Sequence, residues 1–170
     1  MRAPVLSDDF PSSQLKIFGH SMHLVYDQQK AIIYGGILGM AAQVQATTSE
    51  LFELNLDTLA LRKIKPKAES RKPKPRAFHA SALISDYLII LGGKGDSQEF
   101  RADLWLFSLC KRDPHSASLS WTQMTILSPS GEHELEFAEL VYHTMISVPK
   151  NNLLVARFAN NVAWSTYFSC

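Results

Sequence analysis

The chain has 170 residues, of which 46% are hydrophobic and 19% are charged, and its formal net charge is +1 at pH 7. These values predict one soluble globular unit with a sizeable core, without a strong electrostatic bias of the whole protein. The sequence has neither a run of about 18 apolar residues nor the apolar centre of a signal peptide, so we expect no membrane span. Its two cysteines, Cys110 and Cys170, make no disulfide framework. A reducing cytoplasm is the default expectation, and the alternatives are the nucleus or, for a piece of a larger secreted or receptor chain, the extracellular space.

The first predicted unit spans residues 18–65 and follows an N-terminal segment, residues 1–17, that could supply a strand to a neighbouring unit. In this unit the apolar run AIIY ends abruptly at Gly35-Gly36, and a long loop, residues 37–49, follows. Apolar stretches bounded by turn-forming residues predict strands joined by tight turns. The four strands are expected at residues 20–26, 31–34, 50–57 and 59–64.

A second unit, residues 76–127, repeats this order after a basic, proline-rich connection at residues 66–75. Its apolar run LIIL ends at Gly92-Gly93, and a polar loop at residues 94–102 follows. The four strands are expected at residues 79–84, 88–91, 103–110 and 120–124. Two units with their patterns in the same order indicate a repeat protein.

A third, partial unit at residues 140–170 follows an acidic loop at residues 128–139. Arg157-Phe158 stands where the glycine pair is expected, so this copy is degenerate, and no fourth strand pattern follows its third strand.

The repeated pattern resembles the kelch repeat, and the resemblance covers roughly residues 18–168. It is carried by the glycine pairs, by an aromatic-rich third strand and by a tryptophan in the fourth strand: Gly35, Gly36, Gly92, Gly93, Asp103, Trp105 and Trp121. The second copy matches better, because Leu61 replaces the expected tryptophan in the first copy. The subfamily is unresolved, although some features are similar to the attractin and muskelin class.

The resemblance implies an all-β fold made of four-stranded antiparallel blades of a kelch-type β-propeller. The propeller would be incomplete, with about two and a half to three blades, whereas closed propellers usually have 4–8. We therefore expect a part of a larger propeller, or self-association through exposed blade faces if the chain is complete. Glycine pairs would let neighbouring groups approach the backbone closely, and the tryptophans would fill the space between blades.

The histidines do not indicate a metal site. His20, His79 and His143 occupy one position of the repeat, which favours a structural role. His20 and His23 are three residues apart and would lie on opposite faces of a strand. The catalytic motifs of serine hydrolases, phosphate loops and zinc proteases are missing from the sequence. We expect no catalytic residues, no metal and no cofactor. The alternatives are a fragment of a propeller enzyme, galactose-oxidase-like or lyase-like, and a fragment of an extracellular receptor propeller.

The strongest feature outside the repeat is basic. Residues 62–76 carry eight Lys or Arg residues and one acidic residue. Three prolines in this segment, Pro66, Pro73 and Pro75, predict an exposed, extended connection. A solvated loop is the simplest interpretation, and a docking strip for an acidic protein, a nuclear-import-like signal or RNA are the functional ones. The absence of interleaved aromatic residues argues against single-stranded nucleic acid.

We expect a non-catalytic scaffold that binds a protein or peptide partner through its inter-strand loops, because loops on a rigid framework commonly carry recognition. The candidate partner-binding residues lie in the basic segment and in the loops after the glycine pairs: Met40, Arg71, Lys72, Lys74, Arg76 and Arg101.

Overall fold

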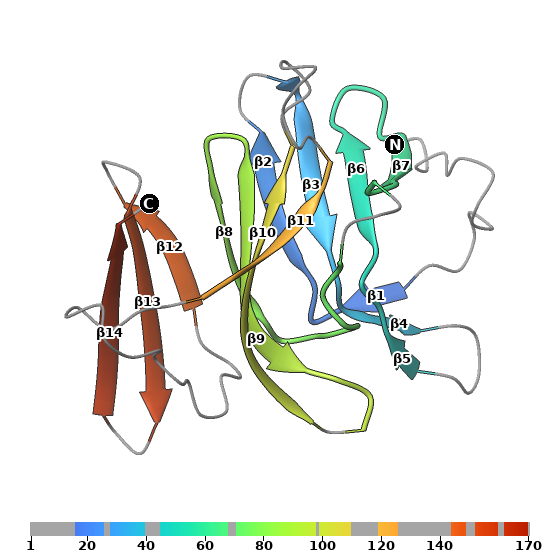
Figure 1. Cartoon of the computed structure of the whole chain (residues 1–170). Coiled ribbons are helices and arrows are strands. Elements are labelled where there is room, and N and C mark those ends of the chain that lie inside the picture. The colour runs from blue at the N-terminus through green and yellow to red at the C-terminus, as the bar shows by residue number, and fades with distance from the viewer. Residues whose placement is uncertain are drawn as a thin grey trace.

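The computed structural model describes residues 16–25, 28–39, 45–67, 71–97, 99–109, 119–125, 144–148, 152–159 and 162–169. This part of the chain is all-β, with antiparallel sheets of three or four strands (Figure 1). A helix with the length and apolar character needed to cross a membrane is not found among these residues.

The first four-stranded sheet, here called sheet 1, has its strands in chain order, but two strands of another sheet, β4 (Ile37–Gly39) and β5 (Gln45–Thr47), come between its second and third strands in the sequence. The order across the sheet is β2-β3-β6-β7. The strands are β2 (Ser21–Val25), β3 (Lys30–Tyr34), β6 (Leu51–Asn55) and β7 (Leu61–Ile64). All four strands lie where the alternating sequence pattern predicted them.

The second four-stranded sheet, sheet 2, repeats this arrangement without an insertion. Its order is β8-β9-β10-β11. The strands are β8 (Ala80–Ile84), β9 (Tyr87–Lys94), β10 (Phe100–Ser108) and β11 (Trp121–Met124). The four strands expected in the second unit are therefore present in the expected order.

A three-stranded sheet, sheet 3, follows in the order β12-β13-β14. The strands are β12 (Thr144–Val148), β13 (Asn152–Ala159) and β14 (Val162–Ser169). The chain runs through Arg157 and Phe158 as one continuous strand, where the other two units have glycines. The acidic loop, Met40, both cysteines and His143 lie outside the described residues.

The segment after the first glycine pair differs from the expected loop. Residues 37–49 contain β4 (Ile37–Gly39) and β5 (Gln45–Thr47), which pair with each other. Strand β1 (Lys16–Phe18) pairs with the other side of β4, with Phe18 opposite Ile37. This small sheet lies at the lower end of sheet 1 in Figure 1.

The loop after the second glycine pair, expected at residues 94–102, is shorter than expected, because strands take up both of its ends. Strand β9 continues through Gly92 and Gly93 to Lys94, and Arg101 of β10 pairs with Gly93. The φ angles of Gly92 and Gly93 are 65° and 101°, and the register of the pairing with β10 shifts between Arg101 and Leu104, opposite these glycines. Residues 94–102 thus form the end of a long hairpin, which projects below the rest of sheet 2 in Figure 1.

The core lies between the facing sides of sheets 1 and 2. Sheet 1 contributes four buried side chains: Ile32, Tyr34, Leu51 and Ile64. Sheet 2 contributes five: Leu88, Ile90, Trp105, Phe107 and Trp121. The other side of sheet 2 packs on Met145 of β12 through a second cluster of alanine, leucine and isoleucine side chains. Sheet 2 therefore lies between sheets 1 and 3, as Figure 1 shows, and the described strands do not close into a ring.

Candidate functional site

The glycine pairs and the repeated histidines belong to one structural motif. A Cβ atom at Gly36 would lie 2.9 Å from the Cβ of His20, and one at Gly93 would lie 2.9 Å from the Cβ of His79. Both glycines have positive φ, 96° and 101°, which L-residues with side chains rarely adopt. The second glycine of each pair is therefore needed because the chain at the repeated histidine position packs directly on it.

The first glycine of the first pair contacts the next unit. A Cβ atom at Gly35 would lie 2.8 Å from the carbonyl oxygen of Arg76 and 2.9 Å from Cε1 of His79. The amide of Gly36 also donates a hydrogen bond of 2.8 Å to the same Arg76 carbonyl. The end of β3 is thus fixed against the segment that leads into sheet 2.

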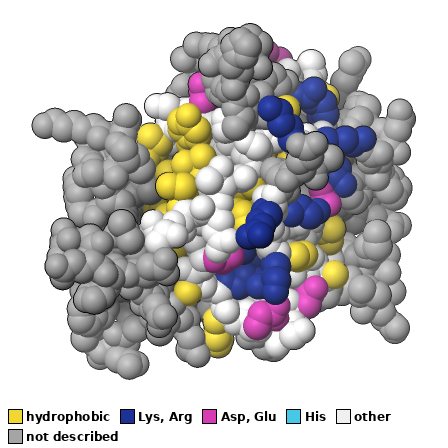
Figure 2. Space-filling view, in the orientation of Figure 1, with side chains coloured by type: hydrophobic (Ala, Val, Ile, Leu, Met, Phe, Trp, Pro, Cys, Tyr) yellow, Lys and Arg dark blue, Asp and Glu magenta, His cyan; other side chains and the backbone are white. Residues whose placement is uncertain are grey.

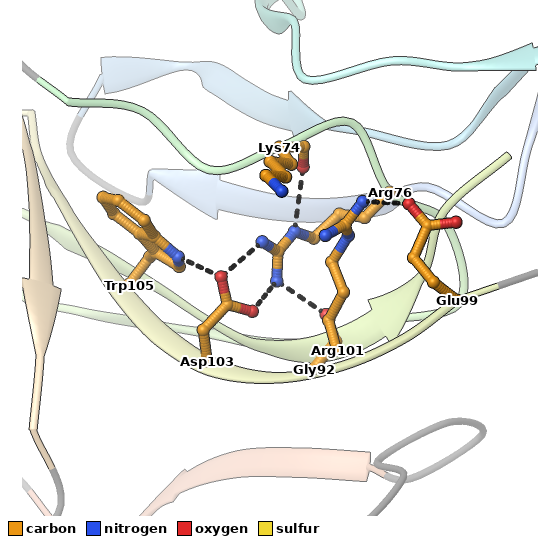
Figure 3. A network of polar contacts seen from close by, with 7 residues as sticks. All are labelled: Lys74, Arg76, Gly92, Glu99, Arg101, Asp103 and Trp105. Atoms are coloured by element: carbon orange, nitrogen blue, oxygen red, sulfur yellow. Dashed lines mark hydrogen bonds and ion pairs between the residues drawn. The ribbon is translucent and has the colours of Figure 1, made fainter. Parts of the chain in front are cut away.

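Arg76 is the centre of a buried polar network, shown in Figure 3. Its guanidinium binds Asp103 in a bidentate manner, with Nη1–Oδ1 2.6 Å and Nη2–Oδ2 2.8 Å. Nη1 also donates to the Gly92 carbonyl at 2.8 Å, and Nε donates to the Lys74 carbonyl at 3.2 Å. Trp105 Nε1 donates to Asp103 Oδ2 at 2.6 Å. Arg76 was expected to be an exposed binding residue, but its side chain is 0% exposed and serves the interior.

The charge state of Asp103 follows from this network. Burial alone would raise the pKa of its carboxyl group, but the hydrogen bonds and charge of Arg76, with the Trp105 N–H, outweigh burial and lower that pKa below its usual value. Asp103 is therefore an ionised partner of Arg76. Its side chain is 27% exposed and accepts hydrogen bonds from both Arg76 and Trp105.

The two tryptophans of the repeat pattern fill the space between sheets 1 and 2. The rings of Trp121 and Phe107 have centroids 4.8 Å apart, and Trp121 and Tyr34, from the facing sheet, are 5.2 Å apart. Trp105 meets Trp121 edge to face at 6.4 Å. Such tilted contacts are the favoured geometries of aromatic pairs, so these residues hold the sheets together.

Two histidine–serine hydrogen bonds join the first strands of the two sheets. His23 Nε2 lies 2.7 Å from Ser81 Oγ, and His79 Nε2 lies 2.9 Å from Ser21 Oγ. Burial lowers the pKa of His23 below its usual value. Groups of three or more histidine, cysteine, aspartate or glutamate side chains suited to a metal do not occur among the described residues.

The basic connection is a fixed strap. We call residues 65–67 and 71–76 the basic strap. Arg71, Lys72 and Lys74 are exposed, whereas Pro73 is fully buried. The Lys67 amide donates to the Leu119 carbonyl at 2.9 Å, and the Arg76 amide donates to the Thr48 carbonyl at 3.1 Å. Figure 2 shows that Lys and Arg side chains gather on one part of the face in view.

The loop candidates lie elsewhere and are partly engaged. Arg101 donates to Glu99 Oε1 at 2.6 Å, and its side chain is only 12% exposed. Across the two units, the Thr47 amide donates to Asp96 Oδ1 at 2.5 Å. The small sheet is therefore joined to the end of the β9–β10 hairpin, and the ion pair of Arg101 is with Glu99 of that same hairpin.

A pocket that was not predicted lies beside the strap. We call it the intersheet pocket: a cavity of about 390 Å³ between the strands of sheet 1 and three residues that lie just outside the strands of sheet 2, namely Asp86, Leu109 and Leu119. Glu53 Oε1 in this pocket accepts from Arg62 Nη2 at 2.9 Å and lies 3.4 Å from Lys30 Nζ. Glu53 lies in an alternating strand pattern, where a charged residue is normally expected to face solvent. The missed signal was that it shares a cross-strand row with Arg62 and the core residue Ile32.

No family model matches this chain. It is similar to part of multiple epidermal growth factor-like domains protein 8 from Rattus norvegicus, with 31% identity over 93 residues, which is 55% of this chain and 3% of that protein. It is also similar to the Arabidopsis thaliana tRNA wybutosine-synthesizing protein 2/3/4, with 26% identity over 97 residues, 56% of this chain and 9% of that protein. A third relative is the Drosophila melanogaster leucine-zipper-like transcriptional regulator 1 homolog, with 30% identity over 104 residues, 61% of this chain and 10% of that protein.

These three relatives are different proteins, and the chain matches at most 10% of the length of any of them. The similarity is therefore one to a segment of longer proteins.

Proposed function

We propose that the chain is part of a kelch-type β-propeller and acts as a non-catalytic scaffold for protein–protein interaction. The propeller assignment is supported by two four-stranded sheets with the same order, each with a histidine packed on the second glycine of its pair. It is also supported by the aromatic contacts between the sheets and by the hydrogen bonds between their first strands. Side-by-side sheets of this kind are the repeating units of propellers.

The observation that supports the interaction role is the basic strap. Three exposed cations, Arg71, Lys72 and Lys74, stand on a segment that two buried residues, Pro73 between them and Arg76 at its end, hold in place. A binding surface ordered in advance loses less conformational entropy when a partner binds. Positive charge on such a surface favours an acidic protein partner and speeds its association.

Peptide display against the full chain tests this proposal. Peptides selected from a random library should be enriched in Asp and Glu. The double variant Arg71→Gln/Lys72→Gln should weaken their binding about tenfold, the effect expected when close charge pairs are lost. The matched control Lys16→Gln/Lys94→Gln removes the same charge outside the strap and should have little effect.

Two outcomes would contradict the proposal: no enriched peptides at all, or enriched peptides that bind both double variants equally. Enrichment of peptides that the protein cleaves or modifies would favour the fragment of an enzyme instead.

A further inference from the structure

The intersheet pocket has the size and the walls of a binding site for a side chain. Its volume of about 390 Å³ lies within the range of roughly 300–1,000 Å³ found for ligand pockets. Five aliphatic side chains line it, three from sheet 1 and two from the ends of the connection between β10 and β11: Val25, Ile32, Ile64, Leu109 and Leu119. An aliphatic side chain placed here would leave water for an apolar surface, which is favourable by about 25 cal/mol per Å².

The rim of the pocket carries excess positive charge. Four basic side chains and two carboxylates line it: Lys30, Arg62, Lys63, Lys65, Glu53 and Asp86. Lys63 binds Glu50 at 3.0 Å, while a single oxygen of Glu53 serves both Lys30 and Arg62. Arg62 is 56% exposed and has five N–H donors, one of which, on Nη2, binds Glu53. Its outer side can therefore bind a second carboxylate.

We call the ion-paired side chains Lys30, Glu53 and Arg62 the ion cluster. The fold does not require it. Sheet 2 builds the equivalent positions without charge, since Leu106 and Thr122 stand where sheet 1 has Glu53 and Arg62. Taking charges out of water destabilises a protein unless their partners are well placed, and apolar residues of similar size often serve equally well. The charges of sheet 1 therefore suggest a role beyond packing.

The basic strap extends this charged rim. Lys65 lines the pocket, and the next residues hold the strap against the opposite wall through the hydrogen bond from the Lys67 amide to the Leu119 carbonyl. The exposed cations Arg71, Lys72 and Lys74 follow on the same strap. Pocket and strap thus place an aliphatic cavity beside a line of positive charge.

We infer that the intersheet pocket, with the adjoining basic strap, binds a peptide in which an aliphatic side chain is flanked by acidic residues. The inference rests on the proposed interaction role and names its site and ligand class. The aliphatic side chain fills the cavity, the acidic side chains bind Arg62 and Lys65, and Asp86 accepts a backbone N–H of the peptide. A nucleic acid fits less well, because two carboxylates line the pocket and no aromatic residue among its lining side chains offers a stacking surface.

Fluorescence polarisation with the full chain tests the inference. The probe is a fluorescein-labelled peptide with a central leucine and two glutamates on each side. Its Kd is expected to be about 10–100 μM, as for a small charged interface. Replacing its leucine by serine should weaken binding about tenfold, because a buried leucine contributes roughly 1.5–3 kcal/mol. Replacing its glutamates by glutamine should weaken binding at least as much, and added salt should weaken binding of the original peptide.

Variants of the chain locate the site. Arg62→Gln and Lys65→Gln should each weaken binding of the leucine–glutamate peptide about tenfold. The matched control Lys16→Gln, an exposed cation outside the pocket, should not. Arg62 and Lys65 are both exposed, so both variants are expected to fold, and thermal unfolding of each variant checks this.

Equal binding of the leucine and serine peptides, equal loss in Arg62→Gln and Lys16→Gln, or no binding of the leucine–glutamate peptide would each overturn the inference. Tighter, Arg62-dependent binding of a thymidine oligonucleotide would overturn it in favour of nucleic acid. If display-selected peptides bind the chain but ignore Arg62→Gln, the pocket assignment is wrong while the proposed function stands. If display selects nothing, the proposed function itself is contradicted.

Discussion

Sheets 1 and 2 share a backbone plan but fill one equivalent cross-strand row with different chemistry. In sheet 1 this row reads, across the four strands, His23, Ile32, Glu53 and Arg62. In sheet 2 it reads Ala82, Ile89, Leu106 and Thr122. The sheet 1 row faces sheet 2 and opens into the intersheet pocket, whereas the sheet 2 row faces β12 in an apolar cluster.

The comparison separates framework from chemistry. Positions that set the backbone, such as Gly36 and Gly93 with their histidines, occur in both sheets. Positions that carry charge differ between the sheets although the strand order is the same. Differences between repeats are therefore a better guide to function than the repeat itself, because the repeated residues are explained by packing.

The largest expected effect concerns Arg76, whose equivalent in front of sheet 1 is Ile17. The variant Arg76→Met should lower the free energy of unfolding by about 3 kcal/mol, because it leaves Asp103 and the Gly92 carbonyl without their buried partner. Urea unfolding of the full chain measures this. Lys72→Met, an exposed position of the same strap, should change it by less than about 0.5 kcal/mol. Equal losses in the two variants would show that the buried network does not stabilise sheet 2.

The second expected effect tests whether the glycine pairs are equivalent. Gly36→Ala and Gly93→Ala should each lower the free energy of unfolding by about 2 kcal/mol, because both φ angles are positive and the new methyl group meets atoms at 2.9 Å. Gly39→Ala is the control, since its nearest neighbour is 3.5 Å away and its φ is not positive. Chemical denaturation of the three variants measures these losses. A loss in only one of the two sheets would break the comparison.

The third effect is a pH dependence of the free energy of unfolding that comes from His23 of sheet 1. Sheet 2 lacks it, because Ala82 takes the equivalent position. Because burial lowers the pKa of His23, the unfolded chain binds the proton more readily than the folded chain. This contribution to stability is fully present above about pH 6.5 and falls as the pH drops towards the folded pKa, by at most about 1.4 kcal/mol per pH unit. Urea unfolding between neutral and mildly acidic pH should show a smaller decline for His23→Gln. An unchanged decline would assign the pH dependence to other groups.

The smallest effect concerns the ion cluster itself. Glu53→Leu, which copies Leu106, should lower the free energy of unfolding by only about 0.5–1 kcal/mol, since partly exposed ion pairs contribute little. The double variant Glu53→Leu/Arg62→Thr, which copies the sheet 2 row further, should recover part of this loss. Thermal unfolding of the single and double variants measures both changes. A loss of several kcal/mol in the single variant would mean that the cluster supports the fold after all.

The strands of sheets 1 and 2 were predictable from sequence because alternation and turn residues are local signals. The β4–β5 hairpin was missed since its pairing with β1 joins segments about twenty residues apart. Arg76 was expected to be an exposed cation, because nothing near it in sequence reveals that Asp103, 27 residues later, binds it. The intersheet pocket was missed for a similar reason: its walls come from sheet 1 and from connecting residues of the second unit, and only their packing shows that Glu53 is partly buried.

The first glycine pair has one further consequence. Side chains at Gly35 and Gly36 would suffer the same kind of backbone strain, but at Gly35 the new methyl group would press on Arg76 and His79 of the next unit, and at Gly36 on His20 of its own unit. The stability of a repeat array is approximately a sum of intrinsic terms for each repeat and coupling terms between neighbours. Gly35→Ala therefore weakens mainly the coupling between the two units, and Gly36→Ala mainly the first unit itself. The difference between their losses of unfolding free energy would measure how strongly one unit's folding depends on the other.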